Sequence, residues 1–273
     1  MFARPALFAR PTLLAAGLAV GLAALLPGPA EAHRRWLLPS STVIAGDASA
    51  VTVDAAASNG LFSFDHRPMP LDGLAITGPD GQAVEPAIIG SGTYRSVFDV
   101  PLAQQGTYRI ALVSDGTMGS YMLDGERRRF RGSVEQVPAG ATEIRTIQTS
   151  GRTETFVTLG APTDAALQAT GRGLEMVPLT HPNDLVAGEP AQMRFLIDGQ
   201  PAAGLEVEFV AGGTRYRDEA GIQTLTADAQ GTVTLQAAEP GMYYLEASHG
   251  GGAEAVPPAP MASYTAVLEF LPL

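Results

Sequence analysis

The sequences YRSVFDV (residues 94–100) and GTYRIALV (residues 106–113) decide the fold of this chain. Apolar and polar side chains alternate along the first stretch, which is the period of a β-strand with one buried face, and the second stretch indicates another strand. Similar short runs lie on either side of them, and glycine, proline and asparagine turn signals separate these runs. Many short strands at this spacing are typical of an antiparallel β-sandwich. The sequence therefore predicts an all-β protein.

A second series of strands begins at residue 174 and ends near residue 271. Each series has a Gly-x-Tyr pattern near its end, which places Tyr108 in the first series and Tyr243 in the second. A tyrosine that enters a late sandwich strand after a tight corner usually pins that corner through its hydroxyl. We interpret both tyrosines as folding devices. Their recurrence predicts two tandem antiparallel β-sandwiches of the Ig-like or transthyretin-like type.

Turn signals and composition divide the chain into four parts. The predicted parts are a signal peptide at 1–32, an N-terminal sandwich at 33–135, a connecting segment at 136–173 and a C-terminal sandwich at 174–273. Within the connecting segment, we expect a short helix over residues 141–148 and a strand over residues 154–159.

The N-terminal segment has the features of a secretory signal peptide. Two arginines form a positive region, residues 13–26 are almost continuously apolar, and a Pro-Gly-Pro sequence then breaks any helix. Ala30 and Ala32 fit the small-x-small cleavage rule, which predicts a cut after Ala32. The alternative is an uncleaved anchor, for which the apolar run is short. We expect a mature protein that resides in the periplasm and does not insert into a membrane.

The composition excludes several classes of chemistry. The chain has no cysteine and no lysine, and its formal net charge is -11. Without cysteine there is no disulfide framework, so the cores must hold by packing alone. Without lysine there is no Schiff base. An acidic surface repels nucleic acid and anionic lipid, so neither is an expected partner.

Cleavage after Ala32 would give His33 a free α-amino group beside its imidazole. A neutral amine and a neutral imidazole suit copper, nickel or zinc far better than calcium or magnesium. A histidine brace needs one more imidazole, and we favour His66, with Asp65 as an axial or supporting group. His181 and His249 are the alternative partners if the two sandwiches fold against each other.

Two other interpretations stay open. A lone histidine is usually a surface or hydrogen-bonded structural residue, and the chain has neither a His-x-His nor a His-x-x-x-His pair. Known catalytic motifs are also absent, so we predict that the protein is not an enzyme. The alternative to metal handling is an exported sandwich module that binds a protein or carbohydrate through its loops. A basic cluster at residues 126–131 is interpreted as a charged sheet edge rather than a phosphate site.

Four segments carry a resemblance to a known family. They are HRRWLLPS (33–40), NGLF with HRP (59–62 and 66–68), ETFV (154–157) and GLEMVPLTHPNDL (173–185). Together they resemble a bacterial exported family, the domain-of-unknown-function (DUF) family 4198, formerly labelled a nickel uptake substrate-specific transmembrane region. The resemblance implies a supporting role in metal acquisition. It also implies outer-membrane receptors or inner-membrane uptake proteins as partners.

Overall fold

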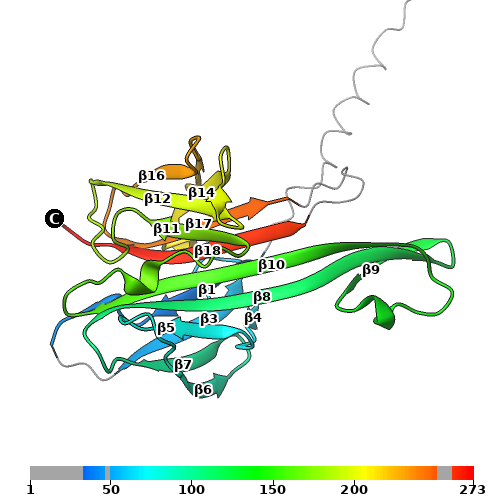
Figure 1. Ribbon diagram of the computed structural model, residues 1–273, viewed down its shortest axis with the longest axis horizontal. Helices are drawn as coiled ribbons and strands as arrows, with labels where there is room; N and C mark the ends of the chain where they lie inside the picture. The colour runs from blue at the N-terminus through cyan, green and yellow to red at the C-terminus, as the bar shows by residue number, and fades with distance from the viewer. Residues whose placement is uncertain (1–32, 47–49, 251–259) are drawn as a thin grey trace, which may run out of the picture. The chain divides into compact units, whose positions relative to one another are not determined.

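The predicted all-β class is confirmed by a computed structural model, which describes residues 33–46, 50–250 and 260–273 (Figure 1). The predicted signal peptide at 1–32 lies outside these residues. The strands form three sheets, which we name the N-terminal, central and C-terminal sheets. No helix in the described part of the chain is long and apolar enough to cross a membrane.

The N-terminal sheet has the order β1-β3-β7-β6, and β4 also pairs with β3. Its strands are β1 (Arg34–Pro39), β3 (Ala50–Ser58), β4 (Arg67–Pro68), β6 (Ala87–Ser91) and β7 (Ser96–Pro101). The C-terminal sheet consists of β11 (Leu174–Pro178), β12 (Pro190–Ile197), β13 (Gln200–Pro201) and β16 (Thr232–Gln236).

The central sheet runs through both halves of the described chain, in the order β15-β14-β17-β18-β10-β8-β5. These strands are β5 (Leu74–Thr77), β8 (Gly106–Leu123), β10 (Thr142–Leu159), β14 (Glu206–Ala211), β15 (Gln223–Thr226), β17 (Gly241–His249) and β18 (Met261–Phe270). Two shorter strands join it, β2 (Val43–Ile44) on β10 and β9 (Glu126–Arg131) on β8. The short 3-10 turns are η2 (Val134–Gln136), η3 (Ala165–Leu167) and η4 (Thr214–Tyr216).

A parallel ladder joins the two halves of the central sheet. β10 pairs with β18 from Thr149 opposite Met261 to Thr155 opposite Val267. We expected antiparallel pairing throughout. The two halves thus share one sheet.

Strand alternation fills a core on each face of the central sheet. Along β17, Tyr243 and Leu245 pack into the core beneath the C-terminal sheet, whereas Tyr244 points to the opposite face. There Tyr244 meets Trp36 of β1 and Val267 of β18 in a separate cluster. Because side chains of one strand point alternately to its two faces, both faces of β17 are buried. The N-terminal sheet also covers its own core on β5, β8 and β10, which includes Phe98 and Ile110.

Both predicted tyrosine corners are confirmed. The Tyr108 hydroxyl donates to the Gln104 carbonyl oxygen at 2.8 Å. The Tyr243 hydroxyl donates to the Glu239 carbonyl oxygen, also at 2.8 Å. Each bond spans the same four residues, so the two corners are built alike.

The predicted short helix over residues 141–148 is wrong. Residues 142–148 are the first part of β10, which continues to Leu159. An isolated helix of about eight residues is marginal in water, and β-branched residues such as Thr146 and Ile147 fit a strand better. The neighbouring strand decides the outcome, because β8 offers an antiparallel partner from Leu159 back to Thr142.

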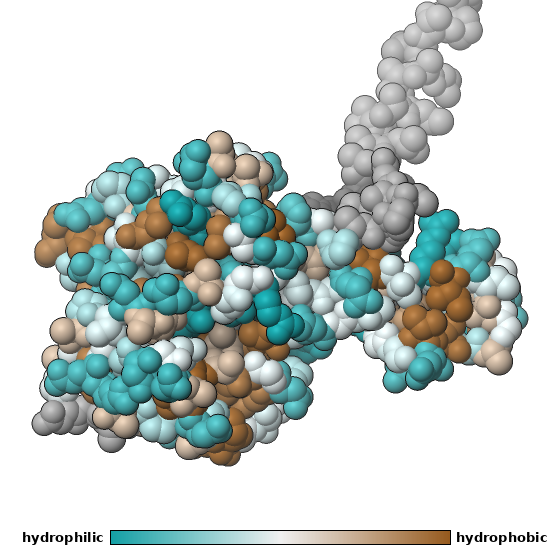
Figure 2. Space-filling model, in the orientation of Figure 1, coloured by the Kyte–Doolittle hydropathy of each residue, from teal (hydrophilic) through white to brown (hydrophobic). Residues whose placement is uncertain are grey.

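The outer parts of β8 and β10 extend beyond the sandwiches as an arm, which we define as residues 116–148. On the N-terminal side of Thr149, β10 no longer pairs with β18, and the sheet narrows to β10, β8 and β9. This arm lies at the right of Figure 1, and Figure 2 shows it as a separate lobe with an apolar patch between polar regions. The basic cluster forms β9, an exposed edge strand as predicted.

Candidate functional site

The structure brings His33 and His66 together. His33 directly precedes β1, and His66 directly precedes β4. Both strands flank β3, because Arg35 and Arg67 each pair with Ala57. The two imidazole rings stack with centroids 3.6 Å apart and planes 5° apart. The favoured partner of His33 therefore lies in direct contact with it.

The stacked arrangement limits what the two rings can do as they stand. Lone pairs of imidazole nitrogens lie in the ring plane, and these two planes are nearly parallel, with ring centroids 3.6 Å apart. One ion cannot lie in both planes, so a shared metal ion requires a ring to rotate about its side-chain bonds. His33 is exposed and His66 is half-buried, which leaves room for rotation. Desolvation, and then the charges of His33 and Arg67, lower the pKa of His66.

Asp65 holds the loop that carries His66. Its carboxylate accepts backbone N–H bonds from Asn59 at 2.8 Å and from Gly60 at 3.1 Å. An aspartate that bonds nearby backbone amides closes a compact loop. This contact positions His66 at the end of β3, so Asp65 supports the pair through the backbone.

The two alternative histidines lie in other surroundings. The His181 ring contacts Thr107 Oγ1 through Nε2 at 3.0 Å, and its Nδ1 accepts the Asn183 backbone N–H at 3.2 Å. Since a backbone N–H only donates, Nδ1 carries no proton and both ring nitrogens are engaged. Burial lowers the pKa of His181. His249 ends β17 and lines a cavity that includes neither His33 nor His66.

Side chains alone do not form a metal-binding cluster in the described part of the chain. In the described ranges, no group of three or more histidine, aspartate or glutamate side chains is placed to hold an ion. A brace would use two imidazoles and the amine of residue 33, which is a smaller set. The possible nitrogen donors at this position are therefore the His33 ring, the His66 ring and the backbone amine of residue 33.

A buried polar network lies where β10 meets β18, and the sequence reading missed it. Glu154 is 1% exposed, and it accepts from Arg152 Nη1 at 2.9 Å and from the Tyr264 hydroxyl at 2.8 Å. Arg152 also donates to Thr170, whose backbone and hydroxyl both donate to Glu175. Burial raises the pKa of Tyr264 well above its ordinary value. The available signal in the sequence was Glu154, an acid in the strand predicted over residues 154–159.

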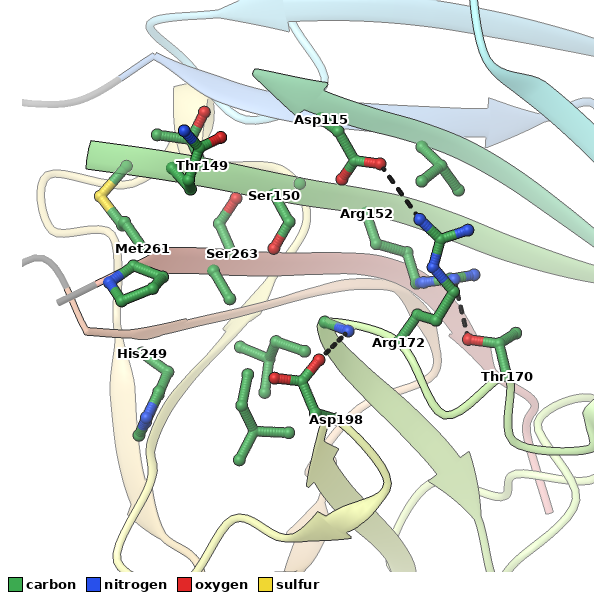
Figure 3. Close-up of a pocket in the computed structure, with 18 residues that line it drawn as sticks. Asp115, Thr149, Ser150, Arg152, Thr170, Arg172, Asp198, His249, Met261 and Ser263 are labelled. Atoms are coloured by element: carbon green, nitrogen blue, oxygen red, sulfur yellow. Dashed lines mark hydrogen bonds and ion pairs between the residues drawn. The ribbon is translucent and has the colours of Figure 1, made fainter. Parts of the chain in front are cut away.

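A cavity of about 690 Å³ opens beside this network (Figure 3). Arg172 reaches Asp115 at 3.6 Å across its opening, and Asp198 accepts the Gly173 backbone N–H at 2.8 Å. In Figure 3 the His249 ring points away from Met261, so these two possible ligands do not converge. The polar groups here mostly pair with one another, which leaves few of them for a ligand.

Comparisons with known proteins identify a family but no activity. A family model described as "Domain of unknown function (DUF4198)" matches residues 30–251. No curated protein matches the chain. The human OSCAR ligand-binding domain is similar at 16% identity and a TM-score of 0.21, over 87% of this chain and 99% of that chain. The D00-D0 domain of Intimin is similar at 12% and 0.22, over 87% and 100%. Trypsin-activated alpha-2-macroglobulin from Escherichia coli is similar at 12% and 0.24, over 91% and 16%. Likenesses this distant bear on no function.

Proposed function

The chain belongs to the DUF4198 family, and we propose that it is a non-enzymatic periplasmic accessory protein that binds copper or nickel through His33 and His66. In this proposal it supports metal uptake or homeostasis. Its partners would be outer-membrane receptors or inner-membrane uptake proteins. The observation that carries the proposal is the contact between the two imidazole rings, 3.6 Å between centroids.

The donor chemistry supports a transition metal. Signal cleavage after Ala32 would add the amine of His33 to its own imidazole and to that of His66, giving three nitrogen donors. Neutral nitrogen donors favour copper and nickel over oxygen-seeking ions. Metal binding requires deprotonated imidazole, so the lowered pKa of His66 reduces competition from protons near neutral pH.

Metal titration tests this proposal. We expect the protein purified from the periplasm to bind copper(II) with submicromolar affinity, and His33→Ala to weaken binding at least 100-fold because it removes one ring of the pair. His66→Ala should weaken it at least tenfold. Calorimetry gives the affinities and electron paramagnetic resonance the nitrogen ligands. Nickel(II) is titrated in parallel.

His249→Ala is the matched control, because His249 lines a different cavity. It should bind copper(II) as the unaltered protein does. Intact mass must show His33 as the first residue. Equal affinity in His33→Ala and the unaltered protein would refute the brace.

The arm favours a second candidate function, an interaction module for an acidic protein partner. Residues 116–148 contain five arginines and four acids, a net charge of +1. The remaining residues from 33 to 273 contain ten arginines and 23 acids, a net charge of -13. Val134 and Ile144 add exposed apolar surface, 42% and 43% exposed. A basic edge strand on an acidic protein suits an acidic surface, which a second copy of this chain also offers.

Charge reversal tests this alternative. Arg129 and Arg131 lie two apart on β9, so their side chains share one face. We expect weak self-association at about 20 mM salt, seen by sedimentation, and its loss at about 0.5 M salt through screening. Arg129→Glu with Arg131→Glu should abolish it at low salt. Arg172→Glu with Arg215→Glu, both exposed and outside the arm, should not. A monomer at every salt concentration would remove this support.

A further inference from the structure

A second, smaller cavity of about 270 Å³ opens at the mouth of the N-terminal sandwich. It lies between the strands β1, β3 and β4 on one side and β8 and β10 on the other. Five polar residues line it: Arg35, Arg67, Asp72, Ser114 and Thr153. It adjoins the His33–His66 pair along the chain, since Arg35 is two residues from His33 and Arg67 follows His66.

Strand register aims both arginines at the same space. Arg35, Ala57 and Arg67 pair directly across β1, β3 and β4, so their side chains share one face of the sheet. Ala57 is buried in the N-terminal core, and so is Leu37, two residues along β1. This face is therefore the interior of the sandwich, and the two guanidinium groups stand at its open end.

No carboxylate lies within ion-pair distance of either guanidinium among the described residues. Arg35 Nη2 donates instead to the neutral Ser263 hydroxyl at 2.9 Å. Gly151 makes room for this, because a Cβ there would lie 3.4 Å from Arg35 Nη1 and 2.8 Å from Ser114 Oγ. Arg35 is thus held in place by a neutral hydroxyl, without a carboxylate in ion-pair contact.

The floor of the cavity selects among anions. Ala57, Met69 and Leu112 line it and are 2%, 6% and 6% exposed. Pro68 and Pro70 flank Met69 and stiffen its backbone. Guanidinium forks bind carboxylate and phosphate equally well in geometry. An apolar floor favours an anion with an organic part, because the carbon atoms of such an anion remove this surface from water and an inorganic anion has none.

We propose that this cavity is a binding site for a small organic carboxylate, which Arg35 and Arg67 hold by its anionic group while its carbon atoms cover Met69 and Leu112. The volume admits a ligand about the size of an amino acid or a short dicarboxylate. The site differs from the His33–His66 pair, and it operates without a metal ion.

Binding of succinate to EDTA-treated protein tests the proposal, with isothermal calorimetry as the measurement. We expect a millimolar or lower dissociation constant, and at least tenfold weaker binding in Arg67→Gln. Arg67 is exposed, so this variant should fold. Asp72→Asn should strengthen succinate binding, because it removes the one negative charge of the lining. Arg95→Gln, an exposed arginine of the same half, is the control and should bind normally.

Sulfate, with the same charge and no carbon, separates the two parts of the proposal. Succinate binding at least fivefold tighter than sulfate binding supports the organic floor. Equal affinities for the two anions, or succinate binding unchanged in Arg67→Gln, would overturn the proposal. Because metal is absent, these outcomes say nothing about the brace, and failure of the copper titration leaves this site intact.

Discussion

Glu154→Ala is expected to lower the free energy of unfolding by about 3–5 kcal/mol. Glu154 is 1% exposed and accepts from both Arg152 and Tyr264. Removing its carboxylate leaves the Arg152 guanidinium, itself 9% exposed, without its ionic partner. An unpaired charge away from water is the most costly defect that a single truncation creates. Equilibrium denaturation in urea at pH 7 measures the loss.

Glu208→Ala is the matched control, because it also removes a carboxylate from an ion pair. The Glu208 side chain is 43% exposed and lies 3.2 Å from Arg34. The Arg34 side chain is 18% exposed, so this pair is part-buried, but its carboxylate reaches solvent. Pairs that reach solvent contribute about 0–1 kcal/mol, so this variant should lose much less stability than Glu154→Ala. Tyr264→Phe should fall between the two, because it removes one hydrogen bond to Glu154 but keeps the ring. Similar losses in Glu154→Ala and Glu208→Ala would show that the network is not an energetic centre.

Trp36→Ala is expected to cost about 3–5 kcal/mol by leaving a cavity between the N-terminal sheet and the central sheet. Trp36 is fully buried, and its ring meets Phe62 and Phe64 edge-on at 5.7 and 5.4 Å. Its indole N–H also donates to Ser58 Oγ at 2.8 Å. Because this tryptophan packs against Val210, Tyr244 and Val267, the loss should destabilise both halves together.

Trp36→Phe separates packing from hydrogen bonding. It keeps an aromatic ring in the cluster and removes the bond to Ser58, so about 1–3 kcal/mol should be lost. Trp36 is the chain's single tryptophan, so circular dichroism must follow the variants. One shared transition at lower denaturant is the expected result for Trp36→Ala. A C-terminal half that keeps the original midpoint would contradict the coupling.

Local signals in the sequence predicted the elements well. The stretch at 94–100 covers all but the last residue of β7, residue 106 begins β8, residue 174 begins β11, and both tyrosine corners have the expected bonds. These features depend on alternation and on turn residues a few positions away. The stacking of His66 on His33 also follows the favoured pairing, whereas binding of a metal stays a prediction.

Features that depend on contacts between residues far apart in the sequence could not be predicted from local sequence signals. Thr149 and Met261 begin the parallel ladder, although 112 residues separate them in the chain. Residues 142–148 form a strand because β8 runs beside them. Their composition alone is also compatible with a helix. Arg152, Glu154 and Tyr264 meet only after that ladder has formed. His181 was predicted as an alternative metal ligand, because no residue near it in the sequence indicates its contact with Thr107.

From Arg145 onward, the regular course of β10 fixes the distance between the arm and the N-terminal sandwich. From Arg145 in the arm to Gly151 beneath Arg35, six residues at about 3.3 Å each span roughly 20 Å. The parallel ladder that follows leaves no hinge between this stretch and the C-terminal half. A cargo held near His33 and a partner held by the tip of the arm would therefore be kept at one fixed separation. Transfer of that cargo would then depend on where the partner places its own binding groups, and not on a hinge motion of this protein.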